Sequence, residues 1–156
     1  MAPLVINQSA FSPYNLLITN LLGTAGPLTS AVTLTTPSSA TLITGLTAFI
    51  TIPSGAVFIK VEVVGKGVTI SAAATITQGA YTGSTSGALT TLFGTQVRLG
   101  ATGGTVCDLN GEYYLPVTPS LYNTSTWISI AATASSGNYV TQASATEPTY
   151  MIITYL

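Results

Sequence analysis

The sequence predicts an all-β fold, an antiparallel β-sandwich or jelly roll of about eight or nine strands with an extended N-terminal arm. Val, Ile, Thr and Tyr recur with a period of two residues, which is typical of strands buried on one face. Gly, Pro, Ser and Asn interrupt these runs at short intervals and mark turns. Charged helix formers are almost missing, because only 4% of the 156 residues are charged.

The predicted strands follow one another through most of the chain. The clearest is 56–64, in which Val57, Ile59, Val61 and Val63 point to one face. A Pro-Ser-Gly turn precedes this strand and a Gly-Lys-Gly segment ends it, while residues 78–87 form a low-complexity connection. The full set of predicted strands is 30–36, 46–52, 56–64, 68–76, 96–99, 113–117, 126–132, 139–142 and 150–156.

Residues 1–28 are predicted to be an extended arm, and residues 29–156 a single β-sandwich domain. Pro3, Pro13 and Pro27 stand among apolar residues in the arm, which favours an arm over a hairpin. An apolar arm must be buried, either under its own sandwich or across a neighbouring subunit. The candidate interface residues are therefore apolar side chains of the arm: Leu4, Val5, Ile6, Phe11, Tyr14, Leu16 and Leu17.

Very few side chains carry a charge: the chain has three Lys or Arg, four Asp or Glu and no His, for a net charge of −1. Nucleic-acid binding by phosphate neutralisation typically uses about 6–10 basic contacts, so we expect no nucleic-acid partner. A net charge close to zero also leaves little repulsion between copies. The composition therefore favours association with copies of this chain or with companion proteins.

The composition also removes most catalytic chemistry. Without histidine there is no Ser-His-Asp or Cys-His arrangement and no zinc site of the usual kind. We expect Cys107, the sole cysteine, to be a buried and inert thiol. A glycosidase needs two carboxylates flanking a cleft, whereas Lys60 and Glu62 are more simply cross-strand partners. We therefore predict no enzyme, no catalytic residue and no cofactor.

One acidic segment has the spacing of a weak metal site. Asp108, Asn110 and Glu112 match the 1,3,5 oxygen-ligand positions of a calcium loop, but no Glu stands at the twelfth position. The favoured alternative is a plain hairpin, because Asn110-Gly111 is a typical type I′ turn. We therefore predict no metal, with these three residues as the candidate ligands if one binds.

The sequence predicts neither a membrane span nor export. Thr, Ser, Gly or Pro interrupts every apolar run before it reaches about 18 residues. No Lys or Arg precedes Lys60, whereas a signal peptide needs a basic n-region. We therefore expect synthesis in a host cytoplasm without a signal peptide.

Two segments resemble bacteriophage fibre and capsid-associated β-sandwiches. In residues 51–67, Thr-Ile-Pro-Ser-Gly leads into an alternating strand that closes on Gly-Lys-Gly. The segments 111–116 and 150–156 are similar to the tail half of such modules. The family's glycine-rich loop after the first strand is here the predicted strand 68–76. The resemblance implies a structural virion protein, often trimeric or otherwise symmetric, that uses no cofactor.

These observations together predict a non-enzymatic virion component: a minor capsid, decoration or spike/fibre subunit, located in the virion. Its partners would be copies of itself or other virion proteins, and a receptor or a glycan could be a further partner. One alternative is an exported cell-surface filament subunit, which predicts modification at Asn7 or Asn123. Another is a carbohydrate-binding β-sandwich module that uses aromatic residues of the last third, such as Tyr122 and Trp127.

Overall fold

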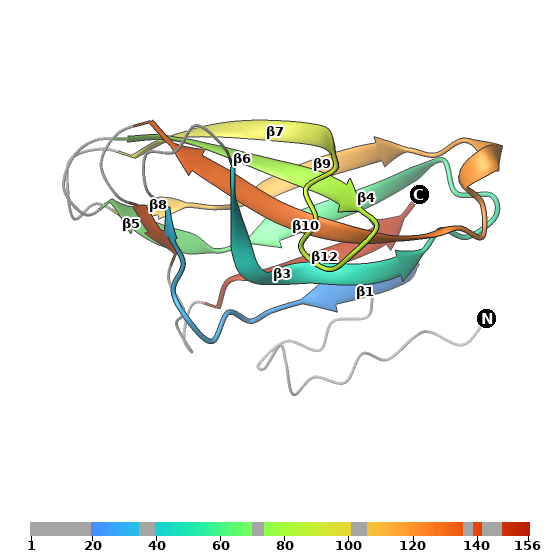
Figure 1. Ribbon diagram of the computed structural model, residues 1–156, viewed down its shortest axis with the longest axis horizontal. Helices are drawn as coiled ribbons and strands as arrows, with labels where there is room; N and C mark the ends of the chain where they lie inside the picture. The colour runs from blue at the N-terminus through green and yellow to red at the C-terminus, as the bar shows by residue number, and fades with distance from the viewer. Residues whose placement is uncertain (1–19, 35–39, 70–73, 101–105, 136–138, 142–147) are drawn as a thin grey trace.

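The computed structural model describes residues 20–34, 40–69, 74–100, 106–135, 139–141 and 148–156. These residues form β-strands and one 3-10 turn, Pro119–Leu121, and they contain no α-helix (Figure 1). The all-β prediction is therefore confirmed. The strands are β1 (Leu21–Ala25), β2 (Thr33–Leu34), β3 (Thr41–Thr51), β4 (Phe58–Val64), β5 (Lys66–Thr69), β6 (Ala74–Gly83), β7 (Thr91–Gly100), β8 (Val106–Asp108), β9 (Gly111–Pro116), β10 (Ser125–Ala134), β11 (Tyr139–Thr141) and β12 (Tyr150–Tyr155).

Two antiparallel four-stranded sheets make the sandwich. One has the order β1-β12-β4-β9 and the other the order β3-β10-β6-β7. The second sheet faces the viewer in Figure 1, and the first lies behind it. We call the outer surface of the β3-β10-β6-β7 sheet the front face, and the outer surface of the β1-β12-β4-β9 sheet the back face.

The pairing of the eight long strands is nested, which defines a jelly roll. The first of them pairs with the last (β1 with β12), the second with the seventh (β3 with β10), the third with the sixth (β4 with β9), and the fourth with the fifth (β6 with β7). A single long hairpin that rolls up on itself gives this order. The sandwich is therefore a jelly roll, which is one of the two architectures that the sequence predicted.

Four short strands form a third sheet, in the order β2-β11-β5-β8, at one end of the sandwich (Figure 1). Each of them lies in a connection where the chain passes from one large sheet to the other. These four crossovers therefore meet at the same end of the molecule, and their backbones are hydrogen-bonded to one another.

The core follows from the alternation that the sequence shows. On β4, Ile59, Val61 and Val63 point inward and are fully buried, as predicted. Val57 does not share that face, because the strand begins at Phe58 and Val57 is 58% exposed. The other sheet contributes a matching set of fully buried side chains: Ile43, Leu46, Ile50, Ile76, Ile128 and Ile130.

A polar clamp joins the two sheets inside this core. Gln78 of β6 is 2% exposed, and its amide Nε2 donates to the carbonyl oxygen of Leu109 (3.0 Å) and to the hydroxyl of Tyr113 (2.8 Å). Its Oε1 is buried and has no hydrogen-bond partner among the described residues. The clamp therefore fixes β6 against the segment that leads into β9.

Several predicted boundaries differ from the structure. Residues 68–76 contain the end of β5 and the start of β6, which belong to different sheets, so they are not one strand. Residues 78–83, predicted as part of a connection, continue β6. The segment predicted as the arm includes β1, which pairs with β12, so the sandwich begins before residue 29. A Thr-, Gly- and Ala-rich strand such as β6 resembles a loop in composition, and only its burial by neighbouring strands reveals it.

Candidate functional site

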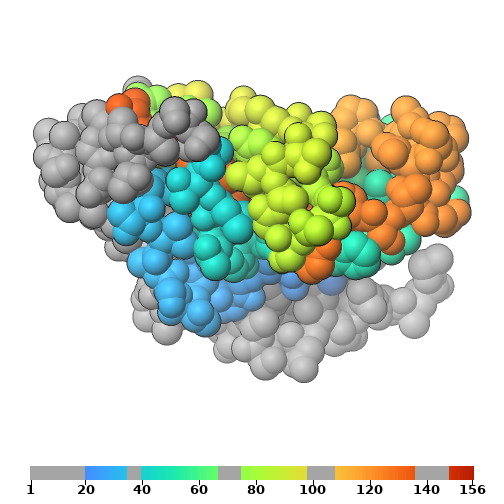
Figure 2. Space-filling model, in the orientation of Figure 1, coloured from blue at the N-terminus to red at the C-terminus, as the bar shows by residue number. Residues whose placement is uncertain are grey.

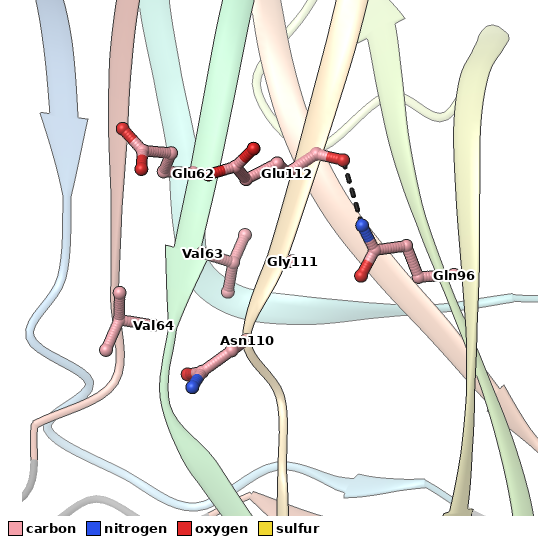
Figure 3. A pocket seen from close by; sticks show the side chains of 7 residues that line it. All are labelled: Glu62, Val63, Val64, Gln96, Asn110, Gly111 and Glu112. Carbon is pink, nitrogen blue, oxygen red and sulfur yellow. Dashed lines mark hydrogen bonds between the residues drawn. The ribbon is translucent and has the colours of Figure 1, made fainter.

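The charged side chains of the described back face meet in one network across β4 and β9. Glu62 lies directly opposite Glu112 in the register of the two strands. The ammonium group of Lys60 bridges them, with its Nζ 3.2 Å from Glu62 Oε1 and 3.6 Å from Glu112 Oε1. Figure 3 shows both carboxylates on the same side of the sheet. The sequence predicted that Lys60 and Glu62 have partners across the strands. The structure pairs Lys60 with Glu112 on β9 and also with Glu62 on its own strand, and only the β4–β9 pairing brings Glu112 close.

This network shifts two pKa values upward. Burial lowers the pKa of Lys60, but the hydrogen bond and charge of Glu62 and the charge of Glu112 outweigh it, so the pKa lies above its ordinary value of 10.5. The hydroxyl of Tyr114 donates to Glu112 Oε2 at 3.0 Å, and this hydrogen bond raises the pKa of Tyr114 above 10.0. Both groups therefore keep their protons through the neutral range.

A cavity of about 420 Å³ lies beside the network (Figure 3). Its polar side chains hold the backbone of neighbouring strands. Gln96 Nε2 donates to the carbonyl oxygen of Glu112 at 2.9 Å, and Asn110 Oδ1 accepts from the amide of Gly65 at 2.9 Å. The two carboxylates that line the cavity share the ammonium group of Lys60. This geometry is that of an ion pair that holds β4 and β9 together, rather than that of a general acid and a general base.

The predicted metal ligands are not assembled into a donor set. Asp108 and Asn110 are exposed, Asn110 bonds to Gly65, and Glu112 belongs to the ion-pair network. In the part of the chain that the structure describes, no three Asp, Glu, Cys or His side chains converge.

The predicted hairpin is wrong. Strand β8 pairs with β5 while β9 pairs with β4, and neither Asn110 nor Gly111 has the positive φ that a type I′ turn requires.

The front face has a different character. Its outward positions, where the structure describes the side chains, hold Thr, Ser, Gly and Ala together with a few large apolar residues, and no charged residue. Phe49 of β3 and Trp127 of β10 form a ring pair with centroids 5.2 Å apart. On β7, Leu92 is 47% exposed and Val97 is 57% exposed, and Phe49 is 54% exposed.

The loop 84–90 between β6 and β7 folds back over part of this face, and we call it the flap. In Figure 1 it crosses in front of β10, and Figure 2 shows side chains of this region in the middle of the front face. A Cβ added to Gly87, whose φ is +75°, would lie 2.8 Å from Leu42 Cδ2 on β3. The flap therefore touches the β3–β10 half of the face, and the positive φ of Gly87 favours glycine there.

The remaining candidate residues have different outcomes. Leu4, Val5, Ile6, Phe11, Tyr14, Leu16 and Leu17 lie outside the described residues, so the interface prediction for the arm is untested. Among the aromatic residues of the last third, Tyr113 is buried in the core, whereas Tyr114 packs edge-on against Phe58 on the back face. Tyr122 packs against the core, so only Trp127 belongs to the front face. No helix among the described residues has the length and apolar character to cross a membrane.

No protein-family model and no curated protein matches the sequence. Solved structures of infectious bursal disease virus are similar to the chain. The Gt strain structure has a TM-score of 0.46 and 12% identity over 98% of this chain and 38% of that chain. A mutant VP2 protein in derived T=1 particles has a TM-score of 0.40 and 11% identity over 96% and 43%. The Gx strain structure has a TM-score of 0.36 and 14% identity over 97% and 42%.

The chain spans about two fifths of the length of those viral chains. Because the TM-scores are below 0.5, the fold class is established by the strand pairing of this chain itself.

Proposed function

We propose that this chain is a non-enzymatic structural component of a virion, a minor capsid, decoration or spike/fibre subunit that acts by packing against copies of itself or other virion proteins. One observation carries the proposal: the front face exposes large apolar side chains, among them Phe49, Leu92 and Val97, without a charged side chain at its described outward positions. Jelly rolls of this topology occur in viral capsid domains, and also in lectins and cupins.

The composition supports packing over chemistry. A fold alone does not determine function, so the argument for assembly depends on the surface. Seven charged side chains in 156 residues cannot keep copies apart, and three of them are used in the back-face network. An exposed apolar surface on such a chain favours contact with another protein.

The test is the association state of the purified full chain, measured by sedimentation velocity over a concentration series at low and high salt. We expect discrete oligomers or particles whose stability changes little with salt, because an uncharged interface is not screened. A chain that remains monomeric at high concentration would contradict packing against copies of itself.

The N-terminal arm is proposed to strengthen this assembly by reaching a neighbouring subunit. A truncation that removes residues 1–19 leaves β1 intact, since β1 begins at Leu21. We expect the truncated chain to keep its sandwich, measured by far-ultraviolet circular dichroism, but to assemble more weakly. If it assembles as well as the full chain, the proposed role of the arm is wrong.

Carbohydrate binding is a second candidate, because the Phe49–Trp127 ring pair lies on the surface beside hydroxyl groups, including the exposed Thr51–Ser125 pair at 2.9 Å. Sugars stack on such rings and bond to such hydroxyls. Binding on a glycan array that disappears in a Trp127→Ala variant would favour this function over assembly.

A further inference from the structure

We propose that the front face is a two-fold interface that packs against the front face of a second copy of this chain. This inference rests on the proposed function, and it adds which surface the copies share. In a two-fold interface the same patch is used by both copies, so the patch must be compatible with itself in charge, size and shape.

The distribution of charge favours the front face over the back face as the interface between two copies. If the back face were buried, Lys60, Glu62 and Glu112 would lose their water, and the desolvation penalty of three ions would oppose binding. The front face offers hydroxyl and apolar groups at its described outward positions, so two copies can meet without removing a charge from water. A partner with a charged surface would lose the hydration of its ions against this face without gaining an opposite charge.

The size of the face is sufficient for a specific interface. Strand β3 has 11 residues, and β6, β7 and β10 have 10 each. At about 3.3 Å per residue and about 4.8 Å between strands, the face measures roughly 33 by 19 Å, or about 600 Å². Two such faces together cover roughly 1,200 Å² when each is treated as flat, and the side chains that project from them add to this area. The flat value already reaches the lower end of the range of about 1,200–2,000 Å² for stable complexes.

The shape of the face is also compatible with a second copy. The flap covers the part of the β3–β10 half where Gly87 meets Leu42, and the β6–β7 half is open around Leu92 and Val97. A two-fold axis parallel to the strands places the flap of each copy over the β6–β7 half of its partner. The exposed side chains of Leu92 and Val97 would then be buried twice, once in each copy.

A matched pair of substitutions tests this interface. Val97 is 57% exposed on the front face, and Val57 is 58% exposed in the connection before β4, away from that face. A lysine at either position costs little in the isolated chain, because both side chains already face water. At position 97 the lysine of each copy would be buried in the two-fold interface, so two charges would lose their water.

We expect Val97→Lys to raise the dissociation constant of the two-copy complex at least about 100-fold, and Val57→Lys to change it less than about threefold. Thr95→Lys, also exposed on β7, should act like Val97→Lys. Sedimentation equilibrium measures the association, and thermal unfolding of each variant verifies that the fold is retained. The second front-face variant keeps the test valid if the first one unfolds.

The outcomes separate this inference from the proposed function. If the wild type associates and both front-face variants associate equally well, the interface lies elsewhere and the inference is wrong, while assembly stands. The same conclusion follows if only Val57→Lys weakens association. If the wild type does not associate with itself at any concentration, the inference fails together with self-assembly as the proposed function.

Discussion

The front and back faces belong to the same sandwich, but their outer surfaces differ in charge. On the back face, Lys60, Glu62 and Glu112 form an ion-pair network at the surface. On the front face, Phe49 and Trp127 lie among hydroxyl groups without a charge at the described outward positions. Burying charges is costly, whereas covering an uncharged face is not. The comparison is the basis for proposing the front face, rather than the back face, as the surface that meets a second copy.

The largest effect is expected from a charge placed beneath the front surface. Ala131 of β10 points outward yet is fully buried, between Gly79 of β6 and Leu42 of β3. We expect Ala131→Lys to lower the free energy of unfolding by about 3 kcal/mol or more, because an unpaired charge would be buried. Urea unfolding measures this change. Thr133→Lys, two residues along the same face and partly exposed, is the control. A loss below about 1 kcal/mol for Ala131→Lys would show that the covered part of the front face is open to water.

The clamp between the two sheets should have the next largest effect. Gln78 and Gln96 are register partners on β6 and β7, but Gln78 is buried and bonds to Leu109 and Tyr113, whereas Gln96 bonds to Glu112 near the surface. We expect Gln78→Met to lower the free energy of unfolding by about 1–3 kcal/mol, because two buried hydrogen bonds are lost. Gln96→Met should cost less. Equal effects in chemical denaturation would contradict the structural role assigned to the clamp.

The back-face network should matter less and should depend on alkaline pH. The pKa of Lys60 is raised in the folded state, so its contribution to stability is complete below pH 10.5 and is lost as the pH rises through the folded value. Lys60→Met should therefore change the free energy of unfolding by only about 1 kcal/mol or less at pH 7, since the pairs lie near the surface. It should also flatten the decline above pH 10.5. An unchanged alkaline decline in the variant would show that Lys60 is not its source.

The smallest effect is expected near neutral pH. The chain has no histidine, which is the side chain that ordinarily changes its charge in this range. The melting temperature should therefore stay nearly constant between about pH 5.5 and 8. A steep change in that interval, measured by scanning calorimetry, would show that a group with a strongly shifted pKa has been missed.

The sequence predicted the features that depend on the alternation of apolar and polar residues along a single strand. The strand 56–64 was recognised because Ile59, Val61 and Val63 alternate with polar residues, and all three are buried. The all-β class, a sandwich or a jelly roll, followed from the number of such runs and from the lack of helix formers, and the strand pairing selects the jelly roll. The prediction that the chain is not an enzyme depends on composition alone, because it needs only the residue types present, and it stays a prediction.

The parts that the sequence did not predict depend on contacts between distant segments. The Asn110-Gly111 pair predicted a hairpin, but β9 pairs with β4, and the amide oxygen of Asn110 accepts a hydrogen bond from Gly65 instead. The opposition of Glu62 and Glu112 follows from the same long-range pairing. The front face was also missed, because the flap that lies on it and the glycine-containing strand β6 that forms part of it both have the composition of a loop.

The most direct measurement is an electron cryo-microscopy reconstruction of the assembly that the purified full chain forms. The account predicts that Leu92 and Val97 of each copy are buried against a second copy, while the Lys60 network remains in contact with water. A reconstruction in which the front face is open to solvent and the back face forms the contact between copies would contradict it.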